Sequence, residues 1–169
     1  IKRWYDGYIL KGHHVYNPMA VVNSITAPVI ADNQLAKVKD NLEVIFPGGD
    51  FKDVSDTYLS DDESGLIDAI YTAKGEGTIF TVHGTGYNSS GLTFMVGFDT
   101  DGKIAGFMAL EQNETSGIGS EVFSDDFASK YKGVGTSDEI PMKSGATLTS
   151  NAVKSGIQAA QKMLSVVKD

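Results

Sequence analysis

The sequence predicts an α+β fold in which an antiparallel β-sheet is flanked by helices. Residues 33–45 and 151–167 carry apolar side chains at helical spacing. Residues 66–82 and 93–110 each read as two strand-like segments joined by a glycine-containing turn. Helices that pack on the outside of such hairpins bury the apolar face of one sheet, which is the arrangement of an α+β domain.

The composition of the chain excludes several classes of function. The chain has 169 residues, 41% hydrophobic and 21% charged, which suits one folded domain with a sizeable core. A net charge of −8 argues against nucleic acid and anionic membrane surfaces as partners, and is compatible with a basic protein. The absence of cysteine excludes disulfides, iron–sulfur clusters and thiolate zinc sites. No run of about 18 apolar residues could span a bilayer, and the three histidines have no metal-binding spacing.

The first 22 residues differ from the rest. They are rich in aromatic side chains, with glycine breakers and an Asn-Pro turn, and we interpret residues 1–22 as an N-terminal arm of unclear origin, a hairpin or extended segment. The main domain is expected over residues 23–169. Within it, Asp32 is a plausible N-cap for the helix 33–45, and Phe46–Gly49 ends that helix.

The segments that follow read as β-rich. Residues 57–59 predict a short strand, and residues 60–65 an acidic turn, for which metal binding is the less favoured alternative. A glycine-rich loop spans residues 83–92 and lacks any phosphate-binding glycine fingerprint. His83 at its edge is expected to be a strand-end polar residue rather than a base, since no carboxylate lies near it in sequence.

Residues 111–119 form a second glycine-containing loop after the hairpin 93–110. An acid–base role for Glu111 or Glu114 has no geometric support in the sequence, so we interpret both as loop or binding residues, and we assign no catalytic residue. Phe123, Phe127 and Tyr131 are spaced four apart, which predicts a short helix with an aromatic stripe directed to the core.

The run Ser144–Ser150 precedes the last helix, whose stripe consists of Val153, Ile157, Ala160, Leu164 and Val167. Small hydroxylated residues that open a helix can bind an anion, because the first backbone N–H groups have no partner inside the helix and the helix dipole favours negative charge there. The alternative is that Thr149, Ser150 or Asn151 merely caps the helix.

Two motifs, at residues 114–119 and 144–149, resemble motifs of the FMN-binding domain family in the same chain order. Ser-Gly-Ala-Thr-Leu-Thr, at 144–149, is similar to its flavinylation motif, and Glu-Thr-Ser-Gly-Ile-Gly, at 114–119, is similar to its Glu-Thr-Pro-Gly-Leu-Gly loop, with Ser116 and Ile118 as departures. The resemblance spans roughly residues 23–165. The family includes the G subunit of Rnf electron-transport complexes, which fits best, and the C subunit of sodium-pumping NADH:quinone reductases.

The resemblance implies FMN joined by a phosphoester to Thr149 and installed from FAD by a flavin transferase. Residues expected to shape the phosphate pocket are Ser144, Gly145, Ala146, Thr147 and Leu148. Residues expected to lie against the flavin are Glu114, Thr115, Gly117 and Gly119. The family's Gly-x-Gly-Tyr segment, matched in the loop 83–92, also lies near the flavin.

The implied function is electron relay within a membrane-bound, ion-translocating ferredoxin:NAD oxidoreductase, with its other membrane subunits as partners. The domain would face the extracytoplasmic side, and the membrane anchor of the family is expected to be absent from this chain, which begins at Ile1. An alternative is the FMN-binding domain of a soluble or lipid-anchored extracellular flavin reductase. A third is an interaction module that binds no flavin.

Overall fold

The computed structural model describes residues 8–10, 13–15, 35 and 38–167, which fall in two compact units, 1–38 and 39–169. In the first unit, β1 (Tyr8–Leu10) and β2 (His13–Val15) pair antiparallel. The remaining expectations for residues 1–34, Asp32 as a helix cap among them, lie outside the described residues. The domain boundary after residue 22 stays a prediction.

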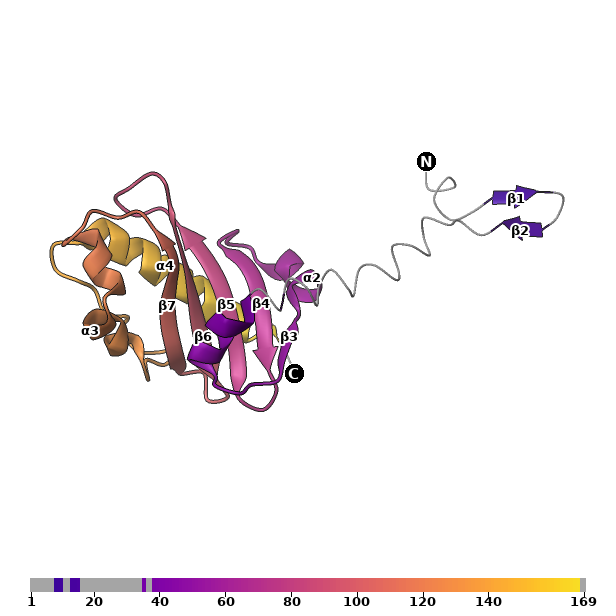
Figure 1. Cartoon of the computed structure of the whole chain (residues 1–169), viewed down its shortest axis with the longest axis horizontal. Coiled ribbons are helices and arrows are strands. Elements are labelled where there is room, and N and C mark those ends of the chain that lie inside the picture. Colours follow the sequence, from indigo (N-terminus) through magenta and orange to yellow (C-terminus); the bar gives the residue numbers. More distant parts are fainter. Residues whose placement is uncertain (1–7, 11–12, 16–34, 36–37, 168–169) are drawn as a thin grey trace. The chain divides into compact units, whose positions relative to one another are not determined.

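The second unit is built on a five-stranded antiparallel sheet in which each strand pairs with the next along the chain (Figure 1). Its strands are β3 (Phe51–Asp53), β4 (Ile67–Ala73), β5 (Gly77–Gly84), β6 (Leu92–Asp99) and β7 (Ile104–Gln112). The α+β prediction and both hairpins are therefore confirmed. Gly75 and Gly102, with φ of 74° and 75°, supply the left-handed backbone at the two tight turns.

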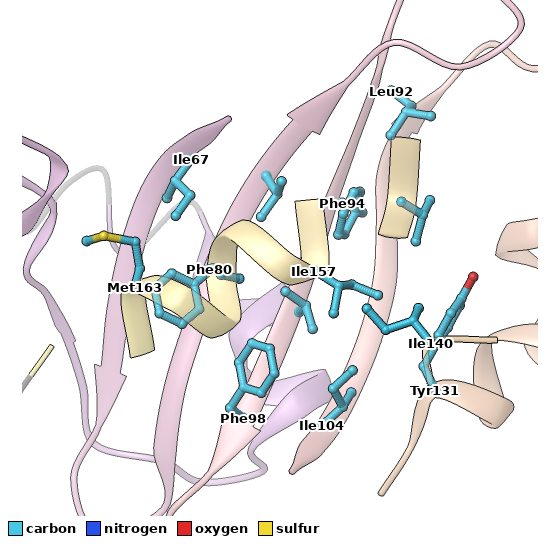
Figure 2. Close-up of a cluster of buried hydrophobic side chains, with 14 of the residues drawn as sticks. Ile67, Phe80, Leu92, Phe94, Phe98, Ile104, Tyr131, Ile140, Ile157 and Met163 are labelled. Atoms are coloured by element: carbon cyan, nitrogen blue, oxygen red, sulfur yellow. The ribbon is translucent and has the colours of Figure 1, made fainter. Parts of the chain in front are cut away.

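One face of the sheet packs against the long helix α4 (Thr147–Leu164). Alternate residues of β6, among them Phe94 and Phe98, join α4 in a cluster of buried hydrophobic side chains (Figure 2). The helix lies close to the sheet at Gly156, where an added Cβ would be 2.7 Å from both Phe94 Cζ and Val82 Cγ1. This glycine lets the helix backbone approach the strands.

The opposite face is covered by the helical residues 39–45. Leu42, Ile45 and Phe46 are buried there. Gly97 on β6 pairs with Gly106 on β7, and the Ile45 side chain fills the space above them, where a Cβ of Gly97 would otherwise stand. The sheet is thus shielded from water on both faces, and most positions of β5 and β6 are buried.

Two local predictions are wrong. The strand expected at residues 57–59 is instead helical, in α2 (Ser55–Tyr58) and η2 (Leu59–Asp61), because Asp53 Oδ1 accepts the Ser55 N–H at 2.9 Å and turns the chain away from the sheet edge.

The single helix expected across residues 123–131 is three short pieces. They are η3 (Gly119–Phe123), α3 (Asp125–Ala128) and η4 (Ser129–Tyr131). Ser124 interrupts the helix in extended backbone, and its side chain accepts the Phe127 N–H as an N-cap. The aromatic stripe does reach the core, as predicted: Phe127 and Tyr131 are buried, and burial raises the pKa of the Tyr131 hydroxyl.

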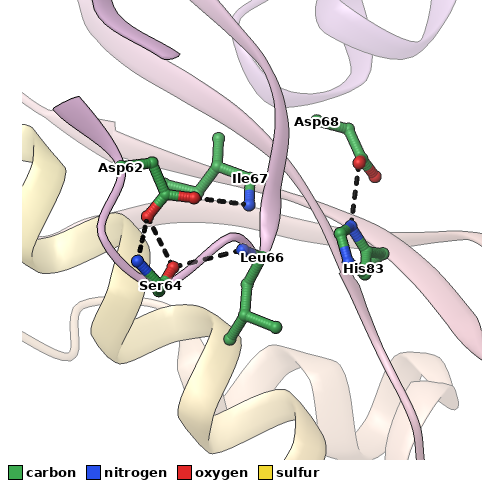
Figure 3. A network of polar contacts seen from close by, with 6 residues as sticks. All are labelled: Asp62, Ser64, Leu66, Ile67, Asp68 and His83. Atoms are coloured by element: carbon green, nitrogen blue, oxygen red, sulfur yellow. Dashed lines mark hydrogen bonds and ion pairs between the residues drawn. The ribbon is translucent and has the colours of Figure 1, made fainter. Parts of the chain in front are cut away.

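The acidic segment 60–65 is a hydrogen-bonded turn, shown in Figure 3. The Asp62 carboxylate accepts the backbone N–H groups of Ser64 and Ile67 at 2.9 and 3.1 Å. Partial burial would raise the pKa of Asp62, but these bonds and the Ser64 hydroxyl outweigh it and hold the pKa below its ordinary value of 3.8. Among the described residues no group of three histidine, aspartate or glutamate side chains could hold a metal ion.

Asp62→Asn should lower the free energy of unfolding at pH 7 by about 0.5–1 kcal/mol, because an amide cannot accept from both N–H groups as well as a carboxylate does. Since the pKa of Asp62 is lowered on folding, its stabilisation is present above the unfolded pKa and is lost as the pH falls through the lowered folded value. Urea denaturation at pH 7 and pH 3 checks this, with exposed Asp61→Asn as control. A difference that persists unchanged at pH 3 would contradict it.

His83 does have a carboxylate partner. Its Nδ1 lies 2.8 Å from Asp68 Oδ1 in the neighbouring strand, where a register shift between Ile67 and Ala69 interrupts regular pairing (Figure 3). Both side chains are about half exposed, and neither lines the cavity described below. The expectation that His83 is a strand-end polar residue therefore agrees with its position at the end of β5.

Candidate functional site

The last helix begins four residues earlier than the predicted residue 151, so that the end of the motif lies inside its first turn. A turn closed by Ala146 N donating to Lys143 O at 3.2 Å precedes it, with Gly145 at φ 85°. The Lys143 N–H in turn donates to Ser150 Oγ at 3.0 Å. The turn and the helix start are thereby held together.

None of the three residues proposed as caps is the N-cap. That position is Ala146, whose side chain accepts no hydrogen bond, and Thr149 and Ser150 are buried within the helix. Because Ser150 N donates to Ala146 O at 2.9 Å, the N–H groups of the three residues before Ser150 have no partner within the helix. Three such donors at the positive end of an 18-residue helix are an arrangement that favours a negatively charged group.

A cavity of about 380 Å³ opens at this helix end, within the volume range of small-ligand sites. It lies between the loop after β7 and the start of α4. Its lining residues are Tyr87, Thr115, Ile118, Gly119, Gly145, Ala146, Thr147, Leu148 and Thr149. Three of these are large apolar or aromatic side chains that are more than half exposed: Tyr87 (71%), Leu148 (58%) and Ile118 (52%). Such a rim suits the faces of a flat aromatic ring.

A buried carboxylate joins the two motifs. Thr149 Oγ1 donates to Glu114 Oε2 at 2.6 Å, and the backbone N–H groups of Tyr87 and Asn88 donate to the two Glu114 oxygens at 3.2 and 3.3 Å. Two glycines make room for this carboxylate. A Cβ on Gly86 would stand 2.5 Å from Glu114 Oε1, and one on Gly119 would stand 2.6 Å from Glu114 Oε2.

The structure thus brings most of the predicted site residues together. Ser144, Gly117 and Glu114 do not line the cavity, although Glu114 contacts Thr149 directly. Glu111 is exposed near the end of β7. The assignments of individual residues to the flavin and its phosphate stay predictions. Tyr87 and Ile118 were not assigned to the site; the Gly-x-Gly-Tyr loop and the position of Ile118 between two site glycines were the available signals.

A wider cavity of about 610 Å³ lies beside the edge strand β3 and is lined by residues of 50–58 together with Thr72 and Lys74. No motif residue reaches it. In the part of the chain that the structure describes, no helix combines the length and the apolar character needed to cross a bilayer.

Comparison with known proteins defines the class. Residues 86–162, which contain both motifs and every residue that lines the cavity, match the model of the FMN-binding domain family. It is 28% identical over 156 residues to the G subunit of the proton-translocating ferredoxin:NAD(+) oxidoreductase complex of Clostridium ljungdahlii. That alignment covers 84% of this chain and 80% of the relative. The resemblance deduced from the two motifs is therefore confirmed.

The residues present fit an FMN group. The apolar rim matches the isoalloxazine ring, and the N–H groups at the start of α4 match a phosphate. The glycines at positions 119 and 145 add no side chain to the lining of the cavity.

Proposed function

We propose that this chain carries FMN as a phosphoester of Thr149 and relays electrons as the G-type subunit of a membrane-bound, ion-translocating ferredoxin:NAD oxidoreductase. The observation that carries the proposal is the position of Thr149: the residue borders a cavity at a helix N-terminus, in the first turn of α4. A phosphate on this hydroxyl would lie beside N–H groups that have no partner within the helix.

Attachment requires FAD and a flavin transferase. Thr149 Oγ1 would bond to the flavin-side phosphorus of FAD while the P–O bond to AMP breaks, AMP leaves with the bonding electrons, and the hydroxyl proton passes to a base of the transferase or to water. Ser144–Leu148 would surround the phosphate, and Thr115, Gly117 and Gly119 would lie against the ring. FMN, when bound, supplies the redox chemistry, and the protein sets its position and surroundings.

The partners that follow are the other membrane subunits of the complex, and the domain would lie on the extracytoplasmic side of the membrane. The similarity to the clostridial G subunit over most of both chains supports the assignment to such a complex. A covalent bond would keep the flavin on a domain in a compartment where free flavin is scarce. The relay role gives no residue of this chain a bond-making task on a substrate.

Thr149→Val tests the attachment. Co-expressed with a flavin transferase, the wild type should gain one FMN in its intact mass and fluoresce after denaturation, whereas Thr149→Val should do neither, because valine keeps the shape of threonine but lacks the hydroxyl. Thr149→Ser is the matched control and should still be modified. An unmodified wild type, or a fluorescent Thr149→Val protein, would refute the assignment.

A further inference from the structure

The Thr149 hydroxyl is closed off in this conformation. The residue is 1% exposed, and its proton is engaged by Glu114 Oε2 at 2.6 Å. A Cβ on Gly119 would stand 2.9 Å from Thr149 Oγ1, so the backbone of that loop lies directly over the hydroxyl. A nucleophilic oxygen needs the electrophilic phosphorus at about 3–3.5 Å with its leaving group in line. The described packing leaves no such approach for a nucleotide held by another protein.

The cover is the segment 113–119, which connects β7 to η3 and which we name the latch segment. Its own turn is closed by local hydrogen bonds, such as Ile118 N to Thr115 O at 3.1 Å. Most of its side chains are exposed, and Gly117 adopts a positive φ of 75°. Few contacts would have to break for this segment to move as a unit.

The hydrogen bonds identified between the latch segment and the loop after β5 or α4 pass through two groups. The Glu114 carboxylate accepts from Tyr87 N, Asn88 N and Thr149 Oγ1, and the Asn113 carbonyl accepts from Asn88 Nδ2 at 2.5 Å. Bonds to an ionised group are stronger than those between neutral groups. Glu114 therefore contributes most to holding the latch segment in its closed position.

We propose that the latch segment controls access to Thr149: it must open before the hydroxyl can be esterified, and Glu114 holds it closed in the unmodified chain. This inference rests on the proposed attachment of FMN to Thr149. Esterification removes the proton that Thr149 donates, so the contact with Glu114 exists only before loading. The segment would then rest against the flavin instead of against the hydroxyl.

The test measures kcat/KM of loading by a flavin transferase with FAD, followed by intact mass. Glu114→Gln should raise kcat/KM by about tenfold, since it weakens charge-assisted bonds and the rate at low protein concentration follows the open fraction. Glu111→Gln, a change of the same type at the exposed carboxylate nearby, should leave it unchanged. Amide hydrogen exchange in residues 113–119 should accelerate in Glu114→Gln and stay as in the wild type in Glu111→Gln.

A second variant keeps the test independent of Glu114. Asn88→Ala removes the bond to the Asn113 carbonyl without touching Thr149, and should also load faster than the wild type. If Glu114→Gln loaded more slowly while Asn88→Ala loaded faster, Glu114 would be the acceptor of the hydroxyl proton. That result would overturn the proposal that Glu114 holds the latch segment closed. If the wild type is modified and both variants load at the wild-type rate, the proposed role of the latch segment is refuted, but the attachment of FMN to Thr149 is not. A wild type that is never modified would instead refute the attachment on which the inference rests.

Discussion

Gly119→Val is expected to keep the latch segment from closing over Thr149. A Cβ at this position would meet Glu114 Oε2 at 2.6 Å and Thr149 Oγ1 at 2.9 Å, and valine adds two methyl groups to that clash. Because both neighbours are buried, the segment must shift outward, and overpacking of this kind costs about 1–3 kcal/mol of the free energy of unfolding. Amide hydrogen exchange across residues 115–119 should rise, and a urea melt should show the loss of stability.

Gly117→Ala is the matched control for Gly119→Val. It lies in the same segment at φ 75°, with no atom within 4 Å of an added Cβ. Its cost is backbone strain alone, about 1–2 kcal/mol, and it should leave the contact between Glu114 and Thr149 in place. If Gly119→Val exchanged no faster than the wild type, the loop could absorb the side chain and the close packing over Thr149 would not matter.

Gly156→Val should be the most damaging substitution in the core. The new side chain would enter the space where α4 approaches the sheet, 2.7 Å from Phe94 Cζ and Val82 Cγ1, and both of those residues are fully buried. Replacing glycine inside a helix recovers a few tenths of a kcal/mol of helix propensity. Overpacking outweighs that gain, and we expect a net loss of about 2–3 kcal/mol, or about 5–10 °C in Tm.

Thermal unfolding followed by circular dichroism measures the effect of Gly156→Val. Gln158→Val, at an exposed position of the same helix, reports the cost of a β-branched residue without the clash and should change Tm by only a degree or two. Equal melting temperatures for the two variants would mean that α4 moves away from the sheet without cost.

The main elements could be predicted because their signals are local. The hairpins carry alternating apolar residues around glycine turns, and α4 carries a stripe of which Val153, Ile157 and Ala160 are indeed buried. The start of α4 could not be located in this way, because a helix whose N-cap is Ala146, without a capping side chain, lacks the usual signal. The helical turn after Asp53 was missed for a different reason: the hydrogen bond from the Ser55 N–H to Asp53 Oδ1 redirects the chain.

The site was predicted in part because its two motifs resemble those of the FMN-binding domain family. The contact between them was not, because Glu114 and Thr149 are 35 residues apart in sequence and meet only when α4 packs against the sheet. The pairing of His83 with Asp68 has the same origin, in the register of β4 against β5. Distances of this kind depend on tertiary packing, which no local pattern encodes.

The capping position of α4 shows a compromise between a protein's own stability and its chemistry. The motif offers serine and threonine on both sides of Ala146, yet the one residue that could cap the helix has only a methyl group. A serine or aspartate there would typically add about 1 kcal/mol of helix stability by accepting the N–H of Leu148 or Thr149. It would also compete with any incoming anion for those same donors. An alanine at this position therefore leaves the helix less stable than it could be, and it leaves the N–H groups at the helix N-terminus without a competing side-chain acceptor.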